Sequence, residues 1–191
     1  RAMTRVSRRK DTTSAVAVTK PDISIVVPMY NEEAMIDAFF FRIGRALEGL
    51  GTSYEIICVN DGSKDRTEAR LAEAHARDPR IKVINLSRNF GKETALTAGL
   101  DHASGGAVIP IDADLQDPPE LIPEMIRRWR QGYEVVLAVR KDRSSDSWAK
   151  RMSAAAFYRT INWLTRTPIP ANAGDFRLMD RKVVNVMKRM R

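Results

Sequence analysis

The sequence predicts an α/β fold, with a doubly wound, mostly parallel sheet covered by helices on both faces. Short, continuously apolar segments alternate with longer segments in which apolar residues recur every three or four positions. Apolar runs of this kind are typical of parallel strands buried on both faces, and the intervening lengths suit crossover helices. The 191 residues, 43% of them hydrophobic, are enough for one core. A single folded domain is therefore expected.

The first two strand and helix pairs follow the same pattern. Residues 23–27 form an Ile- and Val-rich strand, and the helix over residues 32–50 that follows it ends at a glycine. Residues 54–59 form the second strand, which is apolar throughout its centre. A turn with a glycine then leads into a second helix over residues 65–76.

The third strand is predicted over residues 81–86, followed by a helix over residues 91–103, and the fourth strand covers residues 107–111. The next helix is amphipathic, and its apolar face carries Leu121, Ile122, Met125, Ile126 and Trp129. A fifth strand covers residues 133–139. These elements complete the alternating pattern of an open α/β sheet.

The alternation ends beyond residue 140. We expect a helix over residues 147–165, a loop at residues 174–177 and a last helix around residues 181–191. Residues 1–20 mix basic and small residues without periodicity, and we interpret them as a disordered basic arm. The folded domain therefore covers residues 21–191.

Acidic and amide side chains are concentrated at the end of the fourth strand. Asp112, Asp114, Gln116 and Asp117 lie close in sequence, and like charges so near are tolerated only where they face water, accept hydrogen bonds or share a cation. Oxygen ligands suit Mg²⁺ or Mn²⁺, which leave other positions to water and phosphate oxygens. The segment predicts a metal that holds a diphosphate. The alternative is a solvated turn in which Asp117 caps the next helix.

Three more polar segments follow predicted strands, at residues 28–33, 60–65 and 87–92. Ligands of open parallel sheets bind outside the carboxyl ends of the strands, so these segments are expected to converge on one site. The carboxylate of Asp61 precedes a turn glycine, where it can accept hydrogen bonds from a nucleobase. The ring of Tyr30 either lies against that base or packs over the sheet.

Other polar residues of these segments have structural interpretations. Asn31 is a candidate cap of the first helix, Ser63 and Asp65 of the second, and Asn89 of the third. Neither a GxGxxG turn nor a GxxxxGK[ST] loop occurs, which argues against dinucleotide oxidoreductases and P-loop nucleotide hydrolases.

The net charge of +8 is distributed unevenly along the chain. Acidic residues outnumber basic ones over residues 21–126, whereas residues 127–191 carry a large excess of Lys and Arg. The basic segment indicates an anionic partner, such as phosphate or an anionic membrane surface. Nucleic acid is not expected, because no nucleic-acid-binding signature occurs and aromatic residues are only 7%.

The cysteine content and the hydropathy exclude several further classes of protein. The single cysteine, Cys58, lies inside an apolar run, so neither a disulfide framework nor a cysteine metal site is expected. A reducing, cytoplasmic setting fits this composition. No apolar stretch reaches the length of a membrane span, and no signal peptide is recognised.

Five segments, taken in order, resemble the family 2 nucleotide-sugar glycosyltransferases with the GT-A fold. Within that family the resemblance is to the polyprenyl-phosphate branch, which contains bactoprenol glucosyltransferases and dolichol-phosphate mannose synthases. The segments read VPMYNE at 27–32, VNDGS at 59–63, SRNFGK at 87–92, DADLQDPPE at 112–120 and GDFRL at 174–178. The resemblance implies a GT-A, Rossmann-like catalytic domain. The family's C-terminal membrane-anchoring segment has no counterpart in this sequence.

Carried over by position, the resemblance makes Asp112 and Asp114 the DxD pair that binds Mg²⁺ or Mn²⁺, with Gln116 as a further ligand. Many relatives have two aspartates before the turn glycine, and here the first is Asn60. This difference favours Asp61 as the contact to the base. The residues expected to contact the nucleotide-sugar donor are Pro28, Tyr30, Glu32, Asp61, Lys92 and Asp112.

A polyprenyl phosphate acceptor requires cations more than a general base, because the phosphate is already ionised at neutral pH. Arg140 and Arg177 are the expected acceptor contacts. Lys141, Arg143, Lys150 and Arg151 either assist or lie on a solvated face. Asp175 is expected to be catalytic, as a base toward a hydroxyl acceptor, or to orient Arg177 or the sugar.

We therefore predict an enzyme, a metal-dependent inverting glycosyltransferase at the cytoplasmic face of the inner membrane. It moves a hexose, glucose from UDP-glucose as the first candidate, to undecaprenyl phosphate. The alternatives are a family 2 transferase acting on a saccharide hydroxyl and a noncatalytic nucleotide-sugar-binding module. The basic, amphipathic pattern of residues 147–165 either rests on an anionic bilayer or packs on the core. The oligomeric state stays open, a homo-oligomer included.

Overall fold

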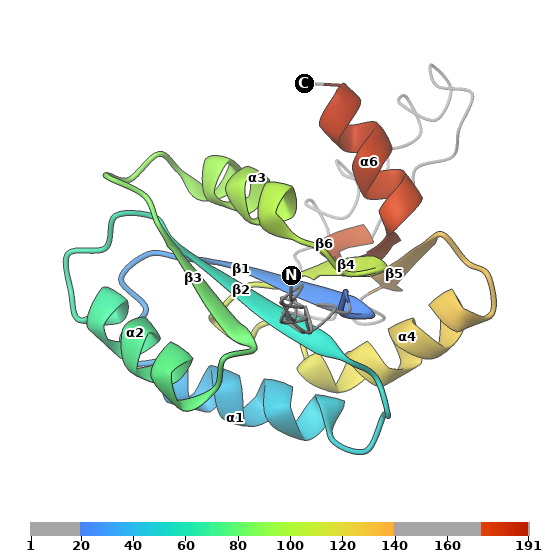
Figure 1. The fold of residues 1–191 in the computed structure, drawn as a ribbon, viewed down its shortest axis with the longest axis horizontal. Coiled ribbons are helices and arrows are strands. Elements are labelled where there is room, and N and C mark those ends of the chain that lie inside the picture. The colour runs from blue at the N-terminus through green and yellow to red at the C-terminus, as the bar shows by residue number, and fades with distance from the viewer. Residues whose placement is uncertain (1–19, 140–172, 191) are drawn as a thin grey trace, which may run out of the picture.

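A computed structural model describes residues 20–139 and 173–190 of the chain (Figure 1). The strands are β1 (Ile23–Met29), β2 (Tyr54–Asn60), β3 (Ile81–Asn85), β4 (Ala107–Pro110), β5 (Val135–Val139) and β6 (Ala173–Asp180). The helices are α1 (Ile36–Leu47), α2 (Thr67–Arg77), α3 (Lys92–His102), the 3₁₀ helix η1 (Pro119–Leu121), α4 (Ile122–Arg130) and α6 (Arg181–Arg189). The five strands expected from the sequence are all present.

The six strands form one mixed sheet in the order β3-β2-β1-β4-β6-β5. Strands β3, β2, β1 and β4 are parallel to one another, whereas β6 is antiparallel to both of its neighbours, β4 and β5. The parallel part follows from continuously apolar strands such as Ile23–Met29, which is buried along nearly all of its length. The predicted mostly parallel α/β sheet is confirmed.

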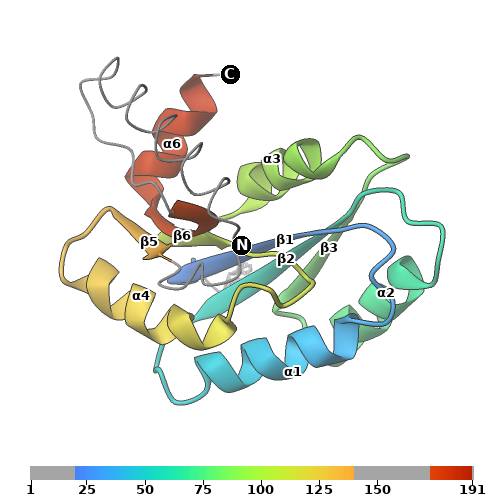
Figure 2. The ribbon, with the colours of Figure 1, turned by 180° about the vertical axis from the view of Figure 1, so that it is seen from behind.

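Helices cover both faces of this sheet, as predicted (Figures 1 and 2). Helices α1, α2 and α4 lie on one face, and α3 and α6 lie on the other. Alternate residues of β1 point to the two layers, because side chains of a strand alternate between faces. Ile25 belongs to the same buried cluster as Phe39 of α1 and Ile126 of α4, whereas Val26 belongs to the cluster that includes Leu100 of α3 and Val184 of α6.

The prediction of a loop at residues 174–177 is wrong, because these residues belong to β6. This strand fills the position between β4 and β5, with Met179 opposite Val108 and Arg177 opposite Leu137. Its sequence, AGDFRLMD, alternates polar and apolar residues only in its middle, over residues 175–178. The strand forms because β4 and β5 supply hydrogen-bonding partners on both sides.

The first helix begins at Ile36 rather than at residue 32. The backbone N–H of Glu32 donates to Thr67 Oγ1 at 2.9 Å, and that of Glu33 donates to Asp65 Oδ2 at 3.2 Å. Asn31 does not cap the helix, because its side-chain oxygen accepts from the Lys64 backbone N–H at 2.8 Å. These long-range bonds hold the segment after β1 against the segment after β2.

A buried carboxylate stabilises the opposite end of the sheet, where β1 and β2 begin. Glu55 is 3% exposed and accepts hydrogen bonds from Ser24 Oγ and Lys82 Nζ at 2.5 Å and from the backbone N–H and hydroxyl of Ser104 at 2.8 Å. Burial alone raises the pKa of Glu55, but these hydrogen bonds outweigh it and lower the pKa to about 2. The charged carboxylate therefore holds three strands and the segment before β4 together.

Two predictions concern segments outside the described residues. They are the basic arm, of which the structure describes only Lys20, and the amphipathic helix over residues 147–165. Within residues 20–139 and 173–190, no helix has both the length and the hydropathy that crossing a membrane requires.

Glu55→Gln tests the role of this carboxylate in stability. The folded-state pKa of about 2 lies below the ordinary value of 4.5, so the ionised group stabilises the protein above pH 4.5 and loses this effect as the pH falls toward 2. We expect Glu55→Gln to lower the free energy of unfolding by about 3 kcal/mol at pH 7 in urea denaturation, and by much less at pH 3. The exposed Glu73→Gln is the control. A deficit that is equal at both pH values would contradict this role.

Candidate active site

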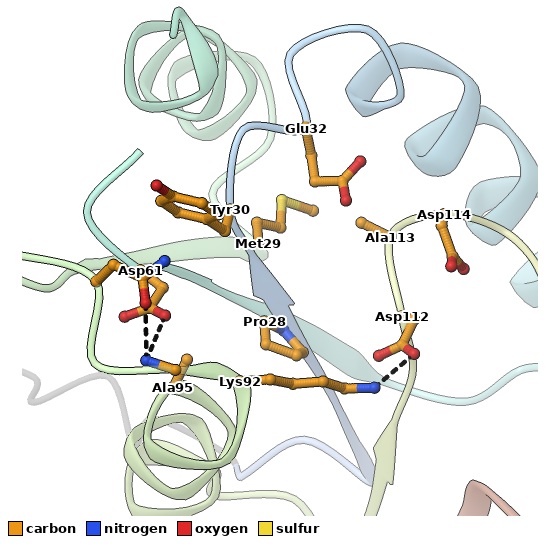
Figure 3. Close-up of a pocket in the computed structure, with 12 residues that line it drawn as sticks. Pro28, Met29, Tyr30, Glu32, Asp61, Lys92, Ala95, Asp112, Ala113 and Asp114 are labelled. Carbon is orange, nitrogen blue, oxygen red and sulfur yellow. Dashed lines mark hydrogen bonds and ion pairs between the residues drawn. The ribbon is translucent and has the colours of Figure 1, made fainter. Parts of the chain in front are cut away.

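A cavity of ≈ 370 Å³ opens at the carboxyl ends of β1, β2 and β4 (Figure 3). Seven of the residues expected to bind donor or metal line it: Pro28, Tyr30, Glu32, Asp61, Lys92, Asp112 and Asp114. Five further residues line the cavity although the sequence does not predict them there: Met29, Asn89, Gly91, Ala95 and Ala113. Of these, only Asn89 carries a polar signal, and the sequence pattern favours a helix cap at that position.

The strand register explains why these segments meet. Met29 of β1 lies opposite Asn60 of β2, so the residues that follow both strands emerge side by side. On the other side of β1, Val26 lies opposite Pro110 of β4, and the Ile111 backbone N–H donates to the Val26 carbonyl at 3.0 Å. Parallel pairing on both sides of β1 therefore brings the three polar segments to one crevice.

One end of the cavity is organised by Asp61. This residue is 3% exposed, and its two carboxylate oxygens accept from the backbone N–H groups of Phe90 at 2.8 Å and Gly91 at 2.9 Å. Asn89 Oδ1 also accepts from the Gly91 N–H, at 3.0 Å. Tyr30 lies beside Asp61 and is 39% exposed (Figure 3). Asp61 thus fixes the loop before α3, while an aromatic face stays open to the cavity.

Gly62 lets the same loop approach the end of β2. Its φ of +65° lies in the left-handed region, and a Cβ there would lie 2.6 Å from the Arg88 Cα and 2.7 Å from the Asn89 backbone nitrogen. The Arg88 guanidinium stacks over the Phe90 ring with its carbon 4.6 Å from the ring centroid. The turn glycine is therefore required both by backbone conformation and by the close approach of the loop.

The other end of the cavity holds three carboxylates, from Glu32, Asp112 and Asp114 (Figure 3). Burial raises the pKa of Glu32, and the negative charges of Asp114, Asp65 and Asp112 raise it further. Leu115 has a φ of +59°. The chain turns there, and Asp114 Oδ1 accepts from the Gln116 backbone N–H at 3.0 Å. Gln116 itself is not among the residues that line the cavity.

These residues fit a divalent cation. No group of three His, Cys, Asp or Glu side chains within the described ranges is close enough to form a complete metal site. Mg²⁺ and Mn²⁺ do not need one, because they commonly bind through one or two carboxylates and take their other ligands from water and phosphate. Burial is the main cause of the raised pKa of Glu32, and a cation at Asp112 and Asp114 would reduce the smaller contribution that comes from their negative charges.

A second, smaller cavity of ≈ 50 Å³ adjoins the first and shares Pro28, Lys92 and Asp112 with it. Arg177 of β6 lines this cavity, and its Nε is buried without a hydrogen-bond partner among the described residues. The structure thus brings one expected acceptor contact next to the carboxylate end of the main cavity. Arg140 lies outside the described residues, and for Asp175 the structure describes only its position in β6.

The family model for glycosyl transferase family 2 matches residues 24–187, which is most of the chain. The chain belongs to glycosyl transferase family 2. It is 49% identical over 166 residues to a bactoprenol glucosyl transferase of Shigella phage SfV, covering 87% of this chain and 54% of that protein. It is also 55% identical over 169 residues to an uncharacterized glycosyltransferase of Synechocystis, covering 88% and 53%. The chain thus spans about half the length of these curated relatives.

Solved structures of glycosyltransferases confirm the GT-A fold of this family 2 domain. A mannosyltransferase from Pyrobaculum calidifontis, in complex with GDP-Man and Mn²⁺, superposes with a TM-score of 0.62 at 18% identity, covering 89% of this chain and 47% of that one. Glucosyl-3-phosphoglycerate synthase from Mycobacterium tuberculosis, in complex with Mn²⁺ and UDP, gives a TM-score of 0.57 at 25% identity, covering 85% and 58%.

Gly62→Ala tests the close approach of the loop. We expect a loss of more than about 2 kcal/mol in the free energy of unfolding, because left-handed strain and a backbone clash act together. Gly49→Ala is a matched control, since Gly49 has a φ of +74° but a Cβ at this position would have no neighbouring atom within 4 Å. Gly49→Ala should lower the free energy of unfolding by about 1 kcal/mol, because only the left-handed backbone conformation is strained. Equal losses in urea denaturation would show that the loop does not constrain position 62.

Proposed function

We propose that this family 2 domain transfers a hexose from a nucleotide sugar to a polyprenyl phosphate, with inversion at the anomeric carbon. The observation that carries the proposal is that one cavity has two chemically different ends. One end offers the Tyr30 ring and the Asp61 carboxylate, and the other offers Asp112 and Asp114. This arrangement suits a nucleoside diphosphate, whose base is planar and whose diphosphate requires cations.

The donor binds across this cavity, with its base between Tyr30 and the loop held by Asp61. Glu32, which lines the carboxylate end of the cavity, is available to the ribose hydroxyls. Asp112 and Asp114 would hold the divalent cation, Mg²⁺ or Mn²⁺, whereas the expected ligand Gln116 does not line this cavity. When bound, this ion would neutralise the charge that develops on the departing diphosphate.

The acceptor supplies its own nucleophile. An ionised oxygen of the lipid phosphate attacks the anomeric carbon, the bond from that carbon to the donor diphosphate breaks, and its electron pair leaves with the nucleoside diphosphate. A single displacement of this kind inverts the configuration. Arg177, together with Arg140, attracts the acceptor phosphate to the smaller cavity, and Asp175 orients Arg177 or the sugar.

The relatives guide the choice of substrates and location. A bactoprenol glucosyl transferase at 49% identity supports undecaprenyl phosphate as the acceptor and UDP-glucose as the donor. The Mycobacterium tuberculosis synthase at 25% identity contains Mn²⁺ and UDP, which supports a metal-dependent site for a UDP-sugar. We therefore propose that the reaction takes place at the cytoplasmic face of the inner membrane, where such a lipid acceptor is reached, with residues 21–191 as the catalytic domain.

Asp114→Ala tests donor binding. We expect the affinity for UDP-glucose in the presence of Mn²⁺, measured by calorimetry, to fall at least about tenfold, because a metal-binding carboxylate is lost. Chelation of the metal should lower the affinity of the wild-type protein for UDP-glucose to a similar extent. Glu48→Gln, an exposed acid distant from the cavity, is the control and should bind as the wild type does. Undiminished, metal-independent affinity of Asp114→Ala would refute the assigned site.

Arg177→Ala tests the acceptor site separately. Transfer of glucose to a short-chain polyprenyl phosphate, measured by mass spectrometry of the product, should fall about 100-fold, because a cation that faces the acceptor is removed. The affinity for UDP-glucose should change less than about threefold, because Arg177 lines the neighbouring cavity. Arg177→Lys should recover part of the rate. Unchanged turnover of Arg177→Ala would remove this residue from the acceptor site.

A further inference from the structure

The carboxylate end of the cavity already contains a cation that belongs to the protein. Lys92 Nζ lies 2.6 Å from Asp112 Oδ2, and Figure 3 shows this ion pair crossing from the start of α3 to the end of β4. Among the described residues that line the cavity, Lys92 is the single basic one, against the carboxylates of Glu32, Asp61, Asp112 and Asp114. One of the two carboxylates assigned to the metal is therefore paired with an internal ammonium group.

This ion pair is suited to exchange. The side chains of Lys92 and Asp112 are 47% and 35% exposed, so both remain hydrated and the pair contributes little to stability. An oxygen of Asp112 that is bonded to an ammonium group is a weaker ligand for a divalent cation, because both cations compete for the same negative charge. The diphosphate of a bound donor offers the displaced ammonium group a new anionic partner at the same end of the cavity.

We propose that Lys92 and the divalent cation compete for Asp112, and that Lys92 moves to the donor diphosphate when the cation binds. This inference rests on the proposed function and adds a role for Lys92. Metal and nucleotide then bind cooperatively, because each removes the ion pair that opposes the other. Such coupling is reciprocal, so the factor by which the nucleotide strengthens metal binding equals the factor by which the metal strengthens nucleotide binding.

The backbone around Lys92 is fixed, so that only its side chain needs to move. The Gly91 N–H donates to Asp61, and the Gly91 carbonyl accepts from the N–H groups of Thr94 at 3.0 Å and Ala95 at 3.1 Å. The flexible four-carbon stem of lysine can redirect a charge from one anion to another, whereas the planar fork of arginine favours a fixed bidentate contact.

Lys92→Met tests the exchange, because it removes the ammonium group and keeps an unbranched apolar stem. Mn²⁺ binding, followed by electron paramagnetic resonance without nucleotide, should become about three- to tenfold tighter, because the competing cation is lost. The affinity for UDP in the presence of Mn²⁺ should fall about tenfold, because a charged contact to the diphosphate is lost. The factor by which Mn²⁺ strengthens the binding of UDP should therefore be smaller in Lys92→Met than in the wild-type protein.

Lys182→Met is the matched control, because Lys182 is 81% exposed and pairs with Glu134 at 3.6 Å, outside the cavity. It should leave both affinities unchanged. A second control restores the amine: Lys92→Cys treated with 2-bromoethylamine carries a lysine-like side chain at position 92. Burial of Cys58 raises the pKa of its thiol, so this only native cysteine stays unmodified. The alkylated protein should regain the wild-type affinities for Mn²⁺ and UDP.

The outcomes separate this inference from the proposed function. If the wild-type protein binds UDP with Mn²⁺ but Lys92→Met binds Mn²⁺ alone no more tightly, the exchange is refuted and the proposed function stands. If Lys92→Met loses UDP affinity only, Lys92 is a simple diphosphate contact and the competition is also refuted. If the wild-type protein shows no Mn²⁺-dependent UDP binding at all, the proposed function itself fails.

Discussion

Parallel hydrogen bonding on both sides of β1 is the constraint on which the candidate active site depends. The β2 register aligns Met29 with Asn60, and the β4 register aligns Val26 with Pro110. A shift of the pairing register by one residue would turn every side chain of β1 to the opposite face of the sheet. Because both faces of β1 are buried, the packing of these two layers fixes the alignment. This alignment holds the polar segments after the three strands close together. The packing of the core therefore determines the geometry of the cavity.

The acidic side chains at the two ends of the sheet lie in opposite electrostatic environments. At the end where β1 and β2 begin, Glu55 receives hydrogen bonds from hydroxyl, amide and ammonium groups, so its charge is compensated within the chain. At the carboxyl ends, Glu32 has a raised pKa because burial and nearby carboxylates both disfavour its charge. Lys92 pairs with Asp112, but the carboxylates of this cluster outnumber it, and a bound cation would supply the missing positive charge. This contrast is the physical argument that the second cluster serves binding rather than stability.

Most of the sheet and most of the cavity lining follow from local sequence, because both depend on apolar runs and on what comes directly after them. Strand β6 does not, since Asp175 and Arg177 interrupt its apolar pattern and its position between β4 and β5 is a long-range property. The start of α1 is also misplaced by the local pattern, because side chains of the segment after β2 hold Glu32 and Glu33 outside the helix. The contribution of Gly91 escapes prediction because it acts through its backbone, which a sequence pattern does not reveal.

The loop before α3 connects the two ends of the cavity through consecutive residues. Asp61 holds the N–H groups of Phe90 and Gly91. The next residue, Lys92, starts α3 and reaches Asp112 on the far side. A base that displaces or strengthens the contacts of Asp61 therefore acts on the segment that anchors Lys92, within two residues of its ion pair. Because one loop carries both contacts, nucleoside binding beside Asp61 and the proposed release of Asp112 would be linked through adjacent residues, without any movement of the sheet.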